Sequence, residues 1–379
     1  MTHETSYDCA IIGGGLAGLS LAIQLCNAGF KVILFEKEQY PFHKVCGEYI
    51  SMESWDHLQS LGLPLPEMDL PRINKLLVSS PDGNQLTQTL DLGGFGISRY
   101  TLDFALKKIA EERGVTVMDN CKVENVIFNN DQFQINSSKG KYLSRVCCGC
   151  FGKRSNLDIG WKRPFVNRLP NKLNHYIGIK YHVKANLPED LIALHNFENG
   201  YCGMSKIEND TYCLCYLSNA ANLKNSHQSI EEMEKNILSA NPFLADIFKH
   251  VTKIYTAPLT ISQISFQTKS QVEDHVLMIG DAAGMITPLC GNGMSMALHA
   301  SKIASKHITR FLNNKTNRSA LEKNYEMEWR KTFSARLRMG RTIQRFFGKT
   351  WITNLFVRVL KRMPAITKML IRQTHGKSF

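Results

Sequence analysis

The glycine-rich turn 13-GGGLAG-18 constrains the fold of this chain more than any other stretch. The apolar run YDCAIIG at 7–13 comes before it and predicts a buried strand. LSLAIQLCNAG at 19–29 has helical spacing and ends at Gly29, a natural C-terminal glycine. KVILFE at 31–36 predicts a second strand. A strand, a helix and a strand in this order indicate a βαβ unit and a parallel sheet.

The spacing of Gly13, Gly15 and Gly18 fits the GxGxxG pattern of dinucleotide-binding turns. The first glycine allows the tight turn, the second lets the backbone approach a pyrophosphate, and the third lets the helix pack on the sheet. The N-terminus of the helix that follows offers unpaired N–H groups to the phosphates, and Leu16 and Ala17 of the turn are cofactor-binding candidates. Glu36, followed by Lys37, ends the next strand, and its carboxylate can accept hydrogen bonds from both ribose hydroxyls of an adenosine.

A second glycine-rich element, 276-VLMIGDAAGMITPLCGNGMSMALHAS-301, indicates which dinucleotide binds. A buried strand ends at Gly280-Asp281, and Pro288 and then Gly291-Asn292-Gly293 lead into a helix predicted over 293–313. The N-terminus of that helix would stabilise the negative charge that reduced flavin carries along N1 and the C2 oxygen. Asp281 can bind the hydroxyls of a ribityl chain. A nicotinamide dehydrogenase needs no such element, so we expect FAD.

These motifs, together with 44-KVCGEY-49 and the helix that contains Arg99, resemble the FAD-dependent oxidoreductases of the geranylgeranyl reductase group. That group is part of the para-hydroxybenzoate-hydroxylase-like flavoprotein superfamily, and the resemblance covers about residues 5–310. It implies an α/β fold with α+β elements: a Rossmann-like FAD-binding domain, an inserted antiparallel-sheet substrate domain and a helical C-terminal tail. It also implies non-covalent FAD, with NAD(P)H as the expected electron donor.

The resemblance assigns site residues by motif position. Gly13, Gly15, Gly18 and Glu36 would hold the ADP half of FAD, and Arg99 would lie along the cofactor. Asp281 would bind near the pyrophosphate and ribityl chain, and Gly291, Asn292 and Gly293 would lie by the isoalloxazine. The remaining cofactor-binding candidates of these segments are Leu16, Ala17, Lys37, Lys44, Gly47, Gly280 and Pro288.

The segment 44-KVCGEYIS-51 supplies the catalytic candidates. It follows the ribose-binding strand, and the chain must pass close to the flavin there. Gly47 would make room, while Cys46 and Glu48 would face the isoalloxazine or the mouth of the substrate site.

One departure from the superfamily comes later, at 149-GCFGKRSNL-157, where Phe151 replaces the aspartate of a Gly-x-Asp-Gly turn. This change argues against a hydroxylase-like NADPH site built around that carboxylate.

Three functions remain open on this evidence. The first is reduction of C=C bonds of a lipophilic, isoprenoid or polyketide-like substrate by hydride transfer from reduced flavin. The second is a flavin-dependent monooxygenase that hydroxylates an aromatic or polyene substrate. The third is a non-catalytic flavin-binding partner at a membrane. A halogenase is less expected, because Trp55, Trp161, Trp329 and Trp351 form no WxWxI stretch.

The eleven cysteines favour buried free thiols in a reducing cytosol. The groups at 147–150 and 213–215 do not form a zinc-finger pattern, so we expect no metal site, although a thiol relay is an alternative. His175, His182 and His195 form no motif and are expected at the surface or in a satisfied core. No apolar run is long enough to span a bilayer and no signal peptide is evident, so a cytoplasmic location is expected.

The positive charge of the chain is concentrated in its last 49 residues. The formal net charge is +13, yet residues 331–379 contain twelve Lys or Arg and no Asp or Glu, which leaves +1 for the other 330 residues. Apolar residues alternate with these charges and predict an amphipathic helix interrupted at Pro364. The apolar positions are Phe346, Phe347, Trp351, Ile352, Leu355, Phe356, Val359, Leu360 and Met363.

Three interpretations of this basic tail compete. It could be a capping helix packed on the body, a contact with anionic lipid or cover for a lipophilic pocket, or a dock for an acidic carrier protein that presents a tethered substrate. No nucleic-acid module accompanies the charge. The expected division is an FAD-binding domain at 1–66, 98–160 and 270–315, a substrate domain at 67–97 and 161–269, and a basic helical region at 316–379.

Overall fold

The predicted βαβ unit forms the centre of a parallel sheet in the computed structural model, which describes residues 5–166, 174–286, 291–346, 349–374, 376 and 378–379. This first sheet has the order β16-β17-β9-β1-β2-β6, and a hairpin of β7 and β8 extends from β9. The pairs β1–β2, β1–β9, β2–β6 and β9–β17 are parallel. Its strands are β1 Thr5–Ile12, β2 Val32–Phe35, β6 Thr116–Met118, β7 Val123–Asn129, β8 Gln132–Ser137, β9 Gly140–Gly149, β16 Val272–Glu273 and β17 Val276–Met278.

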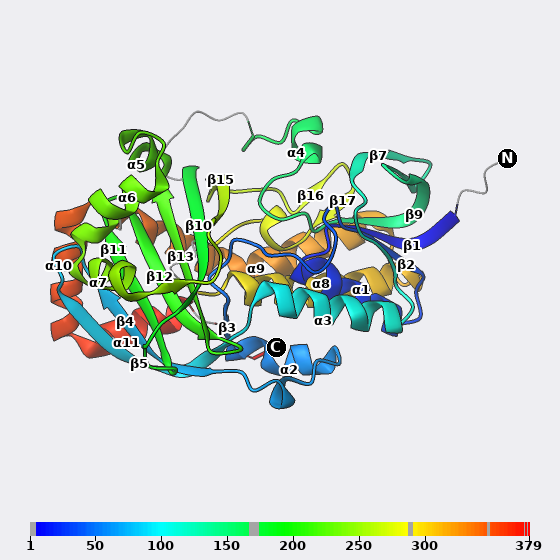
Figure 1. Ribbon diagram of the computed structural model, residues 1–379. Helices are drawn as coiled ribbons and strands as arrows, with labels where there is room; N and C mark the ends of the chain where they lie inside the picture. The colour runs from blue at the N-terminus through cyan, green and yellow to red at the C-terminus, as the bar shows by residue number, and fades with distance from the viewer. Residues whose placement is uncertain (1–4, 167–173, 287–290, 347–348, 375, 377) are drawn as a thin grey trace.

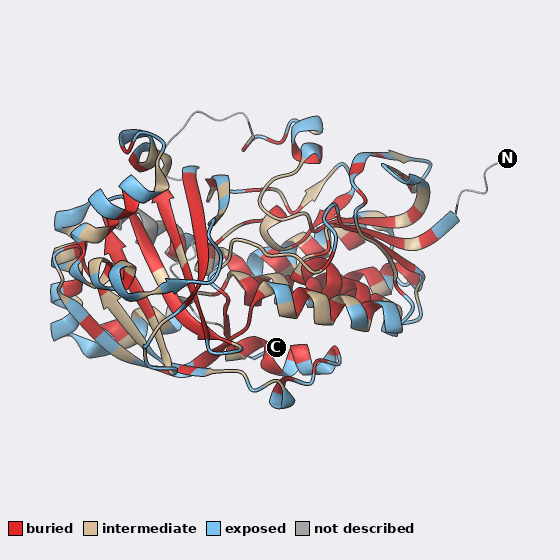
Figure 2. Cartoon of the chain, in the orientation of Figure 1, coloured by how far each residue is buried: buried red, intermediate tan, exposed pale blue. Residues whose placement is uncertain are grey.

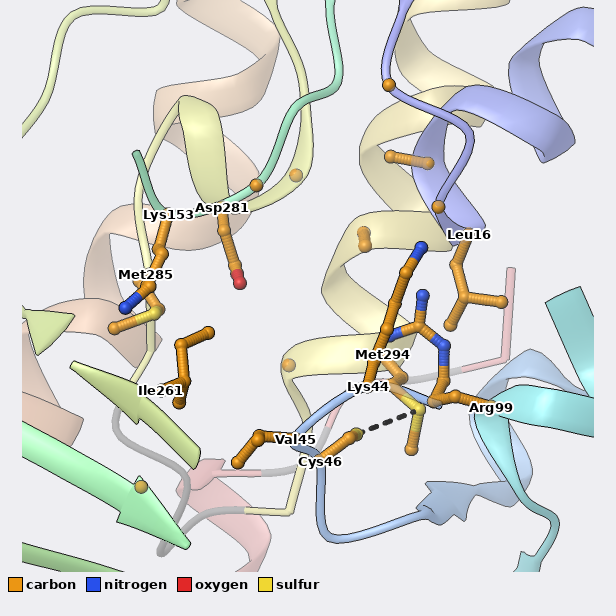
Figure 3. Close-up of a pocket in the computed structure, with 18 of the residues that line it drawn as sticks. Leu16, Lys44, Val45, Cys46, Arg99, Lys153, Ile261, Asp281, Met285 and Met294 are labelled. Carbon is orange, nitrogen blue, oxygen red and sulfur yellow. Dashed lines mark hydrogen bonds between the residues drawn. The ribbon is translucent and has the colours of Figure 1, made fainter. Parts of the chain in front are cut away.

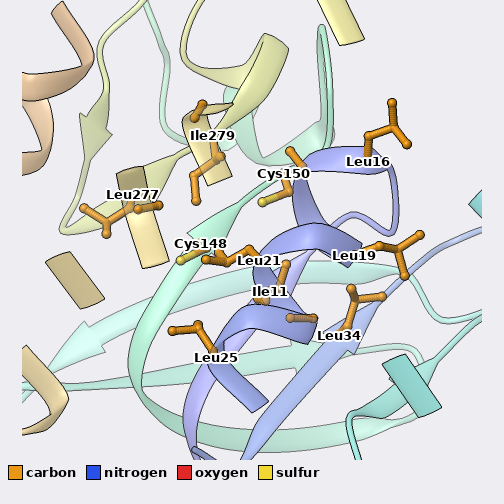
Figure 4. Close-up of a cluster of buried hydrophobic side chains, with 14 of the residues drawn as sticks. Ile11, Leu16, Leu19, Leu21, Leu25, Leu34, Cys148, Cys150, Leu277 and Ile279 are labelled. Atoms are coloured by element: carbon orange, nitrogen blue, oxygen red, sulfur yellow. The ribbon is translucent and has the colours of Figure 1, made fainter. Parts of the chain in front are cut away.

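Four long helices of the described part of the chain pack on this sheet or on one another beside it. Helix α1 (Leu16–Asn27) contacts both α3 (Arg99–Glu112) and α8 (Gly293–Leu312), and α8 contacts α9 (Arg318–Phe346). The core between α1 and the sheet contains fully buried Ile11, Leu19, Leu34 and Cys148 (Figure 4). The near-continuous burial of β1, β2 and β17 explains why their sequences are apolar runs rather than alternating ones.

The second sheet lies beside the first and is largely antiparallel (Figure 1). Its order is β14-β10-β13-β12-β11-β4-β5-β3, and β15 also pairs with β10. The turn at 208–210 joins β12 to β13, with Asn209 and Asp210 at positive φ as tight hairpins require. Its strands are β3 Tyr49–Ser51, β4 Arg72–Ser79, β5 Gln85–Gly96, β10 Asn174–Lys184, β11 Leu191–Phe197, β12 Gly200–Ile207, β13 Thr211–Asn219, β14 Thr252–Lys253 and β15 Leu259–Ser265.

The structure differs from the expected pattern in three places. Strand β11 pairs with β4 in parallel within the antiparallel sheet. Strand β3, which falls in the segment assigned to the FAD-binding domain, belongs to the second sheet. The apolar spacing of residues 229–250 would suit one helix, but the segment is divided, because Asn241 caps a new helix that begins with Pro242. The helices of this region are α5 Ala220–Asn225, α6 Ile230–Asn236, η3 Leu238–Ala240 and α7 Pro242–His250.

The basic tail is helical and packs on the body of the protein. Helix α9 buries Tyr325, Trp329 and Phe333 beside α8, and α10 (Thr350–Arg362) and α11 (Pro364–Thr374) then pack on β5 of the second sheet. Ion pairs fasten these two helices, from Arg358 to Asp82 and from Arg372 to Asp91. The packing required by the capping interpretation is therefore present. Within the described ranges, no helix combines the length and the apolar character needed to cross a bilayer.

The remaining short elements connect these layers. Figure 2 shows that the connecting and tail helices are exposed on their outer sides, whereas the strands and the helices α1 and α8 are largely buried. The short helices are η1 Met52–Ser54, α2 Trp55–Ser60, η2 Leu65–Glu67, α4 Asn156–Gly160 and η4 Gly280–Ala282.

Candidate active site

A cavity of about 1290 Å³ lies where the glycine-rich elements of the first sheet meet one face of the second sheet (Figure 3). This volume exceeds the roughly 300–1,000 Å³ of a typical small-molecule site, so the cavity has room for a dinucleotide and a substrate. Most residues predicted for the site line it. They are Gly13, Gly15, Leu16, Ala17, Glu36, Lys37, Lys44, Cys46, Gly47, Glu48, Arg99, Gly280, Asp281, Gly291 and Gly293.

Two predicted residues, Gly18 and Asn292, do not line the described part of this cavity. Gly18 is buried behind the turn, where any side chain would overlap the carbonyl oxygen of Gly13. Asn292 is buried and caps the start of α8 from its backbone position. Pro288 lies outside the described residues.

The backbone of the first glycine-rich turn opens toward the cavity. Gly13 has φ +108°, and a Cβ atom there would lie 2.5 Å from the carbonyl oxygen of Cys150, so only glycine fits. A Cβ at Gly15 would meet only two cations, 3.4 Å from Arg99 and 3.6 Å from Lys44. No side chain caps the N-terminus of α1, so its first N–H groups remain open to a ligand.

Glu36 connects the end of β2 to this turn. Its Oε2 accepts a hydrogen bond from the backbone N–H of Gly14 at 2.9 Å, and its Oε1 accepts one from Glu38 at 3.1 Å. The carboxylate therefore holds the turn in place, a role that the sequence did not reveal. Each carboxylate oxygen has a further lone pair that can accept a ribose hydroxyl.

Lys44 and Arg99 form a cationic wall organised by Asp103. The Arg99 guanidinium binds Asp103 through two bonds of 2.8 and 2.7 Å, and Lys44 Nζ lies 3.0 Å from the same carboxylate. Arg99 is the first residue of α3, and its side chain is only 13% exposed, so it is largely buried rather than solvated. Sequence analysis missed Asp103, although its i,i+4 spacing from Arg99 was a usable signal.

Asp281 and Lys153 project into the cavity from the side opposite Lys44 and Arg99 (Figure 3). Burial raises the pKa of Asp281, and the nearby Lys269 opposes this shift. Burial also lowers the pKa of Lys153 to about 8. The site thus offers a glycine turn and cations suited to a pyrophosphate, and carboxylates suited to ribose and ribityl hydroxyls. This donor set fits FAD.

The Glu48 carboxylate is fully buried and forms an ion-pair cluster in the wall of the cavity. Its Oε1 accepts hydrogen bonds from the backbone N–H of Arg99 at 2.8 Å and from Lys180 Nζ, and its Oε2 lies 2.6 Å from His182 Nε2. Both oxygens are therefore engaged. The carboxylate therefore connects structural elements, a role that the sequence did not reveal, and its catalytic role stays a prediction.

Burial disfavours the charged form of Glu48, but the hydrogen bond and charge of His182 and the charge of Lys180 outweigh it and lower the pKa of the carboxyl.

Glu48, His182 and Cys213 bring possible ligand atoms within 4.8 Å of one another. Lys180 already supplies the positive charge that a metal ion would bring. His182 is thus a satisfied buried residue, as is His195, which bonds to Ser79 at 2.8 Å, whereas His175 is exposed.

Cys46 lies on the cavity wall among sulfur atoms. Its Sγ is 3.6 Å from the Met294 sulfur. Its backbone carbonyl oxygen accepts a hydrogen bond from the Cys213 thiol at 3.2 Å. Burial raises the pKa of the Cys46 thiol, and Arg99 opposes this shift only in part, so the thiol stays protonated at neutral pH. Cys147, Cys148 and Cys150 are buried in the core of the first sheet, which favours packing over a thiol relay there.

The far end of the cavity is apolar, and sequence analysis did not identify it. Its lining comes from one or two residues on each of four strands of the second sheet, so no local motif marks it. These residues are Ile192 and Leu194 of β11, Tyr201 of β12, Leu217 of β13, and Ile261 and Ile264 of β15. Few polar groups face this end, so it suits a lipophilic molecule.

Two family models match parts of the chain. A model described as "NAD(P)-binding Rossmann-like domain" matches residues 11–45, and one described as "Squalene epoxidase" matches residues 204–340. The chain is 25% identical to Conditioned medium factor receptor 1 of Dictyostelium discoideum, covering 90% of this chain and 71% of that protein. It is 23% identical to Digeranylgeranylglycerophospholipid reductase 2 of Methanothermobacter thermautotrophicus, covering 87% and 85%.

Solved structures share the fold at low sequence identity. A geranylgeranyl bacteriochlorophyll reductase-like protein of Thermoplasma acidophilum superposes with a TM-score of 0.81 at 15% identity, covering 99% of this chain and 97% of that one. The flavin-dependent brominase Bmp2 superposes equally well, at 20% identity, covering 99% and 94%. At these identities the likeness establishes the architecture.

Replacing Gly15 by Ala is expected to weaken FAD binding at least tenfold without affecting folding. The new methyl group meets no atom closer than 3.4 Å, but it fills the surface that a pyrophosphate would approach. Titration of FAD-free protein with FAD, followed by flavin fluorescence, measures the affinity, and thermal unfolding measures the stability. Gly160→Ala, at a glycine with no atom within 4 Å of the added Cβ, is the matched control. Equal FAD affinities for both variants would contradict the assignment.

Glu48→Gln is expected to lower the free energy of unfolding by about 3–5 kcal/mol at neutral pH, because it leaves Lys180 buried without its counter-charge. Adding Lys180→Met should restore part of the loss. Since the folded-state pKa of Glu48 lies below its ordinary value of 4.5, the stabilisation is complete above that pH and disappears as pH falls through the folded-state pKa. Urea unfolding across this range is the measurement. A difference between wild type and variant that stays constant on acidification would refute this.

Proposed function

We propose that this FAD-dependent oxidoreductase, which is similar to geranylgeranyl reductases, reduces C=C bonds of a lipophilic, isoprenoid or polyketide-like substrate. The observation that carries this proposal is the apolar end of the cavity, which continues directly from the dinucleotide-binding residues. Relatives with reductase names act on geranylgeranyl compounds, and the model that matches residues 204–340 is named for squalene. All of these names refer to lipophilic isoprenoids.

Residues at one end of the cavity would bind the cofactor, and residues at the other end would bind the substrate. When bound, reduced FAD supplies the hydride. Lys44 and Arg99, held by Asp103, would neutralise the phosphates, and the open N-terminus of α1 would add its N–H groups. Apolar side chains of the second sheet would align the substrate and exclude water. Phe151, in place of an aspartate, adds an apolar surface beside the cavity.

NAD(P)H is the electron donor that we propose. Lys37, Lys153 and Arg154 line the cavity and are at least partly exposed, so they present positive charge to an approaching anionic dinucleotide.

A monooxygenase is the second candidate, supported by the match to the squalene epoxidase model. The similarity to a brominase concerns the fold alone.

The identity of the product separates the two candidates. FAD on the full-length protein is reduced anaerobically and mixed in a stopped-flow instrument with a geranylgeranylated lipid, with and without O₂. Reduction predicts that the lipid reoxidises the flavin at least tenfold faster than buffer alone does under anaerobic conditions, and that it gains hydrogen by mass spectrometry. Gain of an oxygen atom from labelled O₂, with no anaerobic turnover, would favour the monooxygenase. Purified protein that takes up no FAD would contradict both.

Cys46→Ser and Cys46→Ala are expected to leave FAD affinity largely unchanged and to alter turnover by about tenfold, or to change the product distribution. The reason is that the thiol lies on the cavity wall beside Met294 and Arg99. Steady-state kinetics and product analysis are the measurements. Cys26→Ser is the control, since that thiol contacts the carbonyl of Arg113 and does not line the cavity. Unchanged turnover and products in both Cys46 variants would assign Cys46 to packing.

A further inference from the structure

Exposed apolar side chains concentrate on the last two helices of the chain. The described residues include 13 large hydrophobic side chains that are exposed, and six of them lie between 351 and 369. The other seven are scattered from Leu92 to Met327, as single exposed hydrophobics are in most proteins. The six on α10 and α11 and at their junction, here called the tail face, are Trp351, Leu355, Val359, Met363, Ile366 and Met369.

Helical geometry places these residues away from the body of the protein. On α10, Trp351, Leu355 and Val359 recur every four residues and so share one side of the helix. The buried residues Thr353 and Val357 lie half a turn away, on the side that packs on the body. In α11, Thr367 is buried while Ile366 and Met369 are exposed. Both helices therefore keep an apolar surface after their inner sides have been covered.

Positive charge surrounds the tail face. Lys349, Lys361 and Arg362 are exposed, and within the described part of the chain neither Lys361 nor Arg362 pairs with a carboxylate. Arg358, Lys368 and Arg372 pair with Asp82 and Asp91 of the hairpin formed by β4 and β5, which fixes the orientation of the helices. Residues 331–379 contain no acidic residue. An apolar face bordered by unpaired cations matches an anionic lipid surface.

We propose that the tail face docks on an anionic membrane, with α10 and α11 lying in the plane of the interface. Trp351 would sit at headgroup level, where indole rings are enriched, and the aliphatic side chains would reach the acyl boundary. Lys361 and Arg362 would contact lipid phosphates. An acidic protein is less favoured, because recognition by charge alone would not require six exposed apolar side chains. The proposal does not depend on the reaction that the cavity catalyses, although membrane docking would bring a lipophilic substrate near.

Trp351 provides the main readout, since it is 67% exposed, whereas Trp161 is partly buried and Trp55 and Trp329 are buried. The full-length, FAD-loaded protein is mixed with phosphatidylcholine vesicles that contain or lack phosphatidylserine. Docking predicts a blue shift of the tryptophan emission and co-sedimentation with the anionic vesicles, both weakened by added salt. Replacing Lys361 or Arg362 by Ser should weaken binding about fivefold each, the equivalent of about 1 kcal/mol.

Paired substitutions distinguish binding through the tail face from nonspecific hydrophobic binding to vesicles. Leu355→Ser combined with Met369→Ser should reduce vesicle binding at least tenfold. Met327→Ser on α9 should not, although Met327 is exposed to the same extent as Met369, 52% in each case. Unchanged far-UV circular dichroism and FAD absorbance establish that the variants fold. Equal binding to neutral and anionic vesicles, equal binding by both sets of variants, or binding to a soluble acidic carrier protein but not to vesicles would each overturn the proposal.

Discussion

The buried carboxylate of Glu48 is the interaction on which the geometry of this protein depends. It joins the segment after β2, the first turn of α3 and strand β10 through Arg99, Lys180 and His182. Glu48 itself has φ +54°, a conformation that non-glycine residues adopt at an energetic cost. A buried ion pair is costly to form and more costly to break. The two sheets are therefore locked around the cavity, and Lys44, Cys46 and Gly47 are positioned on its wall.

Charge and polarity divide the cavity into two functional halves. Asp103 concentrates the positive charge of Lys44 and Arg99 at the glycine-rich end, where a dinucleotide phosphate would bind. The face of the second sheet supplies mainly aliphatic and aromatic side chains at the other end. Electrostatic interactions strengthen as water is excluded, so the same apolar wall that would hold the substrate would also strengthen cofactor binding. The site thus supports flavin chemistry on a lipophilic molecule better than on a small polar one.

Local patterns predicted the elements well. The parallel βαβ unit, the helix from Gly293 and the helical break at Pro364 are all present. The break in the helix near Pro242 was not predicted, because the apolar spacing continues across it. Asp103, Lys180 and the apolar wall were also missed. Lys180 lies 132 positions from Glu48 in the chain, and no spacing rule connects residues so far apart.

The sequence by itself determined which segments form turns, helix ends and the crossover of the βαβ unit, and where the positive charge lies. The glycines at 13 and 18, the acidic end of β2 and the acid-free tail are each encoded within one element, because local sterics and periodicity act over a few residues. Only the tertiary structure decided that Glu48 is engaged in ion pairs, that Cys46 lies against Met294, and which side of α10 remains uncovered. Those outcomes depend on burial and on partners from distant segments, and burial is a property that a chain acquires only when it folds.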